Sequence, residues 1–177
     1  ELIELAVRWL RPSETLLARP SFSEYEEAVR KIGGNVAAWP LHAEDDFRVP
    51  DLRQWVRQGA GEASAGTGRS AGLGDPASTV RTDRAIFLGH PNNPTGRLVP
   101  DEVWRGLTQS GAQLIVDEAF MDFVPDEAGR SLLREAAASD RVIVIRSMTK
   151  FYAVPGIRLG FLVAPPDWVR RLAALQT

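Results

Sequence analysis

A single lysine, Lys150, lies among hydroxyl and apolar residues in the stretch SMTKFYAVPG, and Arg158 follows eight residues later. The residues directly after the lysine, FYAV, are apolar, so we expect its surroundings to be dry. Desolvation lowers the pKa of a lysine amine and makes it a usable nucleophile. A solvated loop position is the ordinary role of a lysine and stays the alternative.

A phosphate-binding set is expected around the same lysine. Ser147 and Thr149 supply two hydroxyl donors, and Arg158 supplies one cation. Hydroxyl and guanidinium donors of this kind suit a phosphate ester.

Two further motifs carry polar groups that could act with the lysine. Asp117 ends the apolar run LIV, and NNPTG occupies residues 92–96. A carboxylate at the end of a buried strand costs free energy unless it is paired. The ordinary alternatives are a helix cap or an arginine partner for Asp117, and turn chemistry alone for the Asn-Pro motif. His90, just before that motif, could reach a substrate, but a polar loop position is the simpler interpretation.

The rest of the chain alternates between strand and helix patterns. Three predicted strands are continuous Ile- and Val-rich runs, which are typical of strands buried on both faces. The alternation predicts an α/β fold with helices on both sides of a mainly parallel sheet. We expect strands at 15–20, 35–41, 85–90, 113–119, 141–147 and 158–164, and helices at 1–10, 23–34, 49–59, 100–111, 131–139 and 168–177. Ser23 is the expected N-cap of the second helix.

The polar groups fall at the ends of these strands, where ligands bind in sheets of this kind. Because Arg158 opens the last strand, that strand must return from the same edge, so we predict that it is antiparallel. Pyridoxal phosphate is one cofactor that uses every kind of group found there. It needs a lysine for a Schiff base, a carboxylate on the ring nitrogen, a donor such as Asn93 to the ring phenolate, and an anion site for its phosphate. The sequence therefore predicts a pyridoxal phosphate site.

Three stretches carry a resemblance to a known family: HPNNPTG, LIVDEAFMDF and SMTKFYAVPGIRLGFL. Together they resemble the fold-type I, class I/II aminotransferase-like enzymes that depend on pyridoxal phosphate. Within that family, RSMTKFYAVPGIRLGFL and PSFSEYEEAVR are most similar to the threonine-phosphate decarboxylase branch of cobalamin biosynthesis. Histidinol-phosphate aminotransferases are the near relatives. The resemblance implies a three-layer α/β/α large domain with one antiparallel strand.

The resemblance also implies a role for each motif residue. Lys150 would hold the cofactor covalently and shuttle protons, and Asp117 would pair with the ring nitrogen. Asn93 would donate to the ring oxygen, and Phe22 would stack on the ring, although a core aromatic is nearly as plausible for Phe22.

The phosphate contacts are implied in the same way. Ser147, Thr149 and Arg158 match the family positions that bind the cofactor phosphate. One departure concerns Phe120, which stands where many aminotransferases have a tyrosine that bonds the ring oxygen. The decarboxylase-like branch also resembles DEAF at this place, so the departure favours that branch.

The implied reaction is removal of CO₂ from L-threonine O-3-phosphate to give aminopropanol phosphate. Transamination, as of histidinol phosphate, is the alternative, because the bond that breaks depends on groups that hold the substrate. A ligand-sensing domain of a transcription regulator is an alternative of another class. The resemblance further implies a homodimer with small-molecule amino acid phosphate substrates.

Composition sets outer bounds on these interpretations. The 177 residues carry a net charge of -2, without the basic excess that nucleic-acid or anionic-membrane binding would need. Cysteine is absent, which excludes disulfides and fits a cytoplasmic enzyme, and with only two histidines we expect no metal site.

Both ends lie inside helical patterns, so we expect residues 1–177 to be a cofactor-binding large domain that is incomplete at both ends. The Gly/Ala/Ser-rich stretch 59–79 is predicted to be flexible.

Overall fold

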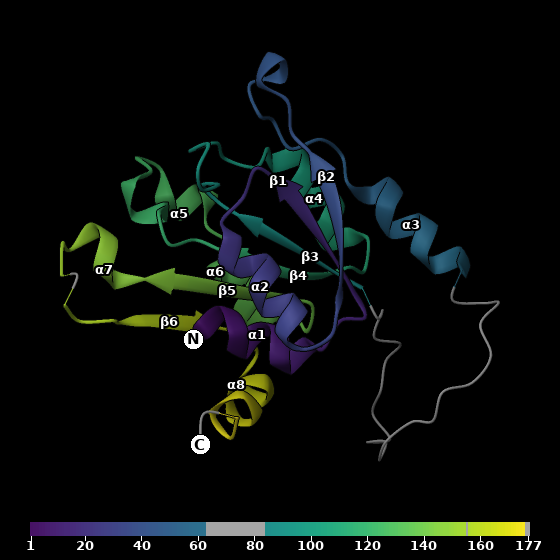
Figure 1. Cartoon of the computed structure of the whole chain (residues 1–177). Helices are drawn as coiled ribbons and strands as arrows, with labels where there is room; N and C mark the ends of the chain where they lie inside the picture. The colour runs from purple at the N-terminus through teal and green to yellow at the C-terminus, as the bar shows by residue number, and fades with distance from the viewer. Residues whose placement is uncertain (63–83, 155, 176–177) are drawn as a thin grey trace.

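A six-stranded sheet forms the centre of the protein in a computed structural model that describes residues 1–62, 84–154 and 156–175 (Figure 1). The strands are β1 (Glu14–Arg19), β2 (Asn35–Pro40), β3 (Arg84–Gly89), β4 (Gln113–Asp117), β5 (Val142–Ser147) and β6 (Gly160–Val163). The helices are α1 (Leu2–Leu10), α2 (Ser23–Lys31), α3 (Arg53–Glu62), α4 (Asp101–Gln109), α5 (Glu127–Arg130), α6 (Leu133–Ala138), α7 (Met148–Phe151) and α8 (Pro166–Ala173), with short 3-10 turns η1 (Ala43–Asp45) and η2 (Met121–Phe123).

The strand order in the sheet is β2-β1-β3-β4-β5-β6. The first five strands are parallel, and β6 pairs antiparallel with β5. Both the mainly parallel sheet and the antiparallel last strand were predicted, and both are confirmed. The carboxyl ends of β3, β4 and β5 therefore lie at one edge of the sheet, where the backbone bonds from His90 N to Asp117 O and from Glu118 N to Ile145 O, each 2.8 Å long, continue the ladders.

Each face of the sheet carries its own apolar core. One core joins Leu5 of α1, Tyr25 of α2 and Leu172 of α8 to Phe87 and Ile115 of the sheet. The other core lies on the opposite face, under α3, α4 and α6, and contains Trp55, Val103, Ala136, Val116 and Val144. Because side chains alternate along a strand, successive residues of β4 and β5 enter opposite cores. The expected three-layer α/β/α arrangement is thus confirmed.

Most helix and strand ends differ by a few residues from the sequence-based expectations, and three of the differences concern residues that were singled out. Phe22, not Ser23, is the N-cap of α2, and no side-chain bond caps this helix. Arg158 does not open the last strand, because β6 begins at Gly160. Of the stretch predicted to be flexible, residues 59–62 belong to α3, and residues 63–79 lie outside the described residues.

The helices are short. Among the residues that the structure describes, no helix has the length and apolar character needed to cross a bilayer.

Candidate active site at the carboxyl edge of the sheet

Asp117, the last residue of β4, carries a buried carboxylate at the carboxyl edge and is only 8% exposed. Its Oδ2 accepts a hydrogen bond from the Tyr25 hydroxyl at 2.8 Å, and its Oδ1 accepts one from the Ala119 backbone N–H at 3.0 Å. Within the described part of the chain, no ion pair reaches Asp117. Burial raises the pKa of Asp117, while the two hydrogen bonds and the Lys150 ammonium lower it in part. A cation brought to this carboxylate would favour its ionised form.

Tyr25 is the site residue that sequence reasoning missed. It lies on the buried face of α2, where its ring stacks on Phe87 with centroids 4.0 Å apart. Burial and the charge of Asp117 raise the pKa of Tyr25 above its usual range, so the hydroxyl stays protonated and donates. A tyrosine at a core position of an amphipathic helix signals a hydroxyl that needs a buried partner. That signal does not say which partner, since Asp117 is 92 residues away.

The turn after β3 is held by Asn92 rather than by Asn93. Asn92 is buried, and its Nδ2 donates to Pro20 O at 3.0 Å and to Thr95 Oγ1 at 2.9 Å. These bonds tie the turn to the segment that leads into α2. Asn93 is half-buried, and in the described chain its side-chain amide makes no hydrogen bond, so the amide is free to meet a ligand.

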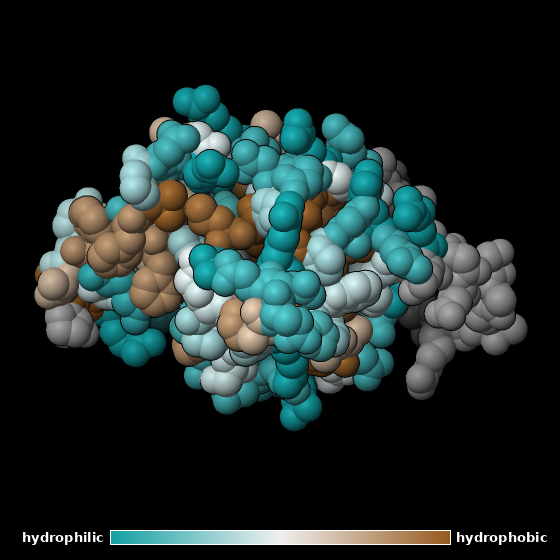
Figure 2. Space-filling view, turned by 90° about the horizontal axis from the view of Figure 1, so that it is seen from above, coloured by the Kyte–Doolittle hydropathy of each residue, from teal (hydrophilic) through white to brown (hydrophobic). Residues whose placement is uncertain are grey.

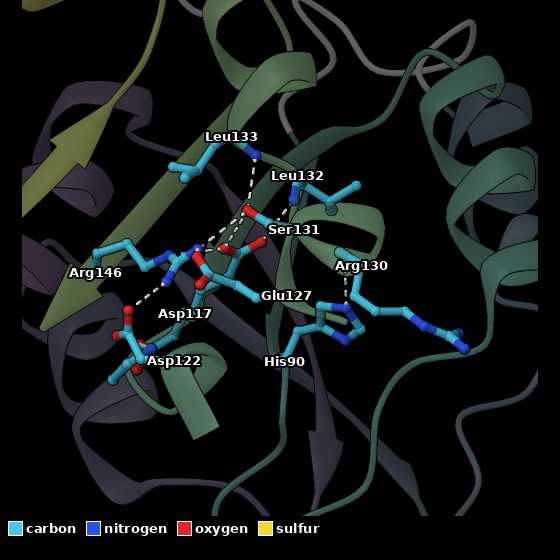
Figure 3. A network of polar contacts seen from close by, with 11 residues as sticks. His90, Asp117, Asp122, Glu127, Arg130, Ser131, Leu132, Leu133 and Arg146 are labelled. Atoms are coloured by element: carbon cyan, nitrogen blue, oxygen red, sulfur yellow. Dashed lines mark hydrogen bonds and ion pairs between the residues drawn. The ribbon is translucent and has the colours of Figure 1, made fainter. Parts of the chain in front are cut away.

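His90 lies in the loop directly after β3, which agrees with the simpler of its two interpretations, and it is buried there. The ring is fully buried, its Nδ1 accepts the Val99 backbone N–H at 3.0 Å, and its Nε2 lies 3.1 Å from Arg130 O as a donor (Figure 3). Burial lowers the pKa of His90 to about 4, so the ring is neutral. His90 joins the turn after β3 to α5 and does not face a ligand site.

The lysine motif forms a sharp strand-to-helix transition. β5 ends at Ser147 and α7 begins at Met148. The Ser147 and Thr149 hydroxyl oxygens lie 2.9 Å apart, and both side chains are half-buried. This pair of adjacent hydroxyls is the part of the predicted phosphate set that the structure brings together.

Lys150 is exposed, and so are its neighbours Phe151 and Tyr152. The expectation of dry surroundings is wrong for this chain, because the apolar residues after Lys150 are themselves exposed and do not cover it. Lys150 is nevertheless close enough to Asp117 for its ammonium to lower the pKa of that carboxyl.

Phe22 and Arg158 complete the predicted set. The Phe22 ring meets Tyr25, the donor to Asp117, edge-on with centroids 5.7 Å apart, and it is 37% exposed. Arg158 is exposed in the connection between α7 and β6. In the described residues no contact joins Arg158 to the Ser147 and Thr149 hydroxyls, so the structure does not itself assemble the full anion set.

The family model described as aminotransferase class I and II matches residues 1–177. The chain belongs to the aminotransferase class I and II family. Enzymes of this family depend on pyridoxal phosphate.

Two curated relatives illustrate the family's range. A threonine-phosphate decarboxylase of Salmonella typhimurium is 34% identical over 166 residues, covering 89% of this chain and 38% of the relative. A histidinol-phosphate aminotransferase of Moorella thermoacetica is 31% identical over 173 residues, covering 95% of this chain and 39% of the relative. The chain thus spans about two fifths of the length of these relatives.

A solved structure shares the fold. The histidinol-phosphate aminotransferase from Clostridium acetobutylicum superposes with a TM-score of 0.73 at 25% identity, covering 99% of this chain and 46% of that one.

The residues at the carboxyl edge fit the family's cofactor in one decisive respect. Asp117 is a buried carboxylate held by two neutral donors, Tyr25 and the Ala119 N–H, without a cationic partner among the described residues. The protonated ring nitrogen of pyridoxal phosphate is a cation with one N–H to donate, and would complete this set. Ser147 and Thr149 offer two hydroxyls to the phosphate.

Proposed function

We propose that the protein containing this chain is a pyridoxal-phosphate-dependent decarboxylase of an amino acid phosphate. The specific reaction we propose is conversion of L-threonine O-3-phosphate to aminopropanol phosphate in cobalamin biosynthesis. The observation that carries the cofactor assignment is the buried Asp117 carboxylate, which forms no ion pair with the described residues and lies near Lys150. Residues 1–177 would form the large, cofactor-binding domain.

Each residue of the site has a distinct task in this proposal. Lys150 would hold the cofactor through its amine and would be the base or acid that moves a proton at the substrate α-carbon. Asp117 stays ionised beside the ring nitrogen and keeps that nitrogen protonated. Tyr25 holds the carboxylate in place, and Phe22 covers the ring. When bound, pyridoxal phosphate supplies an electron sink for the bond that breaks.

The remaining contacts orient the cofactor. Asn93 would donate its free amide to the ring oxygen, and Ser147, Thr149 and Arg158 would hold the phosphate. Arg158 has to move toward the hydroxyls for this, which its exposed position allows.

Two observations support the proposal of decarboxylation. The Salmonella relative that matches 89% of this chain is a threonine-phosphate decarboxylase. Phe120, whose ring lies 6.4 Å from Phe123, offers no hydroxyl to the ring oxygen, unlike the tyrosine expected in many aminotransferases. The second candidate, transamination of histidinol phosphate, is supported by the Moorella relative and the Clostridium structure.

A homodimer is the assembly that we propose. Phe123, Phe151 and Tyr152 form a chain of edge-on aromatic contacts, with centroids 5.3 and 5.4 Å apart, and all three are strongly exposed. Figure 2 shows apolar side chains gathered at the end of the molecule where α5 and α7 lie. An apolar surface of this kind marks a contact site. We further propose that the enzyme works in the cytoplasm, in keeping with its lack of cysteine.

The cofactor assignment is tested by covalent labelling of the chain in its complete reading frame. Pyridoxal phosphate is added, the adduct is reduced with borohydride, and the digest is mapped by mass spectrometry. The chain offers its own control, because Lys31 and Lys150 are its two lysines, and Lys31, the last residue of α2, is paired with Glu4 of α1. We expect a pyridoxyl group on Lys150 and none on Lys31, and loss of the label in Lys150→Ala but not in Lys31→Ala. A folded protein without label on Lys150 would overturn the assignment.

The reaction is tested on protein that takes the pyridoxyl label on Lys150. L-threonine O-3-phosphate is supplied together with pyridoxal phosphate, and the release of CO₂ is measured. Release of CO₂ supports the decarboxylase. Amino transfer from histidinol phosphate to a 2-oxo acid, without release of CO₂, would favour the second candidate.

A further inference from the structure

The two strands that carry the site residues also carry a second polar cluster on their other face. Asp117 and Ser147 point to the face covered by α2, since they share the parity of Ile115 and Ile145. Glu118 and Arg146, their direct neighbours, point to the face of Val116 and Val144.

Arg146 is the centre of this cluster (Figure 3). Although it is only 3% exposed, its guanidinium donates from all three nitrogens. Nε lies 3.0 Å from Glu118 Oε2, Nη1 lies 3.2 Å from Asp122 Oδ1, and Nη2 lies 2.5 Å from Glu127 Oε1 and 3.3 Å from Ser131 Oγ. These partners come from the end of β4, from η2, and from α5 and its C-terminal end, so one side chain fixes the whole segment that follows Asp117.

Both carboxylate oxygens of Glu118 also accept hydrogen bonds from neighbouring groups. Glu118 is completely buried, its Oε2 accepts the Ser131 hydroxyl at 2.7 Å, and its Oε1 accepts the Leu132 backbone N–H at 2.7 Å. Burial raises the pKa of Glu118, and Arg146 and the two hydrogen bonds oppose that rise. A buried carboxylate with this many donors is well satisfied, and Arg146 is its one cationic partner among the described residues.

The pair joins the two strand ends that the proposed reaction needs. Glu118 follows Asp117 directly, and Arg146 precedes Ser147 directly and Lys150 by four residues. The backbone bond from Glu118 N to Ile145 O holds the same two strands in register. A shift of either side chain would therefore move the aspartate relative to the lysine turn, whose Lys150 side chain is exposed.

We propose that the buried Arg146–Glu118 pair is a positioning pair that sets the distance between the Asp117 carboxylate and the Lys150 turn. The proposal rests on the proposed function, because it gives that distance a catalytic meaning. Neither residue touches the cofactor; both act through the backbone of the residues beside them.

The test uses Arg146→Lys in the complete reading frame, because lysine keeps the charge but cannot bond three carboxylates as a planar fork. The matched control is Arg84→Lys, which weakens the Arg84–Glu14 pair between β1 and β3, with Nε to Oε2 at 2.6 Å, at the opposite end of the strands. Three quantities are measured: amide hydrogen exchange of residues 118–131 and 147–152 in the cofactor-free protein, the pH midpoint of the visible absorbance of bound pyridoxal phosphate, and kcat and KM.

We expect Arg146→Lys to fold, to exchange both segments faster, and to shift the pH midpoint of the absorbance. Its kcat should fall on the order of 100-fold with little change in KM, the loss typical of a displacement of about 1 Å at a reacting centre. Arg84→Lys should leave the exchange of both segments, the pH midpoint and kcat unchanged. If Arg146→Lys does not fold, Asp122→Asn is used, because it removes the negative charge of one partly exposed partner of Arg146. It should change the exchange rates, the pH midpoint and kcat in the same direction and by smaller amounts.

Two results would overturn the proposal in different ways. A folded Arg146→Lys or Asp122→Asn protein that is less stable, yet keeps the wild-type pH midpoint and kcat, would make the cluster a stabilising feature only. A wild-type protein that takes no label on Lys150 would overturn the proposed function itself, and the positioning role with it.

Discussion

Removal of the Tyr25 hydroxyl by Tyr25→Phe isolates the hydrogen bond to Asp117. The ring that stacks on Phe87 remains, so the change deletes one donor from a buried carboxylate. A hydrogen bond to a charged group contributes about 1.5–3 kcal/mol, and the acceptor left behind stays desolvated. We therefore expect the free energy of unfolding of the cofactor-free protein to fall by about 2 kcal/mol at neutral pH.

The loss should depend on pH. Burial raises the pKa of Asp117 above its unfolded value, so the folded state is favoured below the unfolded pKa and loses stability as pH rises through the folded pKa. The Tyr25 bond limits that loss, because it lowers the folded pKa. In Tyr25→Phe the folded pKa rises further, so the difference from wild type should be largest at neutral pH and smaller at the lowest pH where wild type stays folded.

Urea denaturation at the two pH values measures both effects. The other tyrosine, Tyr152, is exposed and provides the matched control, and Tyr152→Phe should change stability by less than about 0.5 kcal/mol. Equal stabilities of the two variants at neutral pH, or a Tyr25→Phe loss that does not vary with pH, would refute the reasoning.

Two further predictions concern other parts of the sheet edge. The pKa of His90, about 4 when folded against 6.5 when unfolded, contributes about 3 kcal/mol of stability that is present above pH 6.5 and lost as pH falls through 4. Urea titrations should show this slope in His42→Gln but not in His90→Gln, and a slope that survives His90→Gln would contradict the assignment. Gly160→Ala would place a Cβ 2.6 Å from Arg146 O, so β6 must move away from β5 and the melting temperature should fall. Gly156→Ala, where nothing lies within 4 Å, should melt like wild type, and equal melting of both variants would count against the close approach.

Local patterns were enough to predict the sheet and the positions of its polar groups. The Ile- and Val-rich runs predicted β3, β4 and β5, because a strand buried on both faces requires an unbroken apolar sequence. A polar residue directly follows each apolar run in the sequence. Its position at the carboxyl edge of the sheet could therefore be predicted once the direction of the strand was known.

The surroundings of those groups could not be predicted in the same way. Lys150 was expected in dry surroundings from its apolar neighbours, yet it is exposed, because burial depends on what packs over α7 and not on which residues lie beside it. Asn92 and Asn93 are equivalent by turn chemistry, and the long-range contact of Asn92 with Pro20 O helps to separate the buried residue from the free one.

The sequence alone therefore predicted the strands, the antiparallel return of β6 and the kinds of group available for a cofactor, since each depends on residues close together in the chain, although the exact ends of the strands differ. Only the tertiary structure decided the partners. Tyr25 and Asp117 are 92 residues apart in the chain, and Arg146 and Glu118 are 28 residues apart. The first pair lies on one face of the sheet and the second pair lies on the other face. Pairings over such distances follow from strand order and register, which bring together side chains that no local pattern relates.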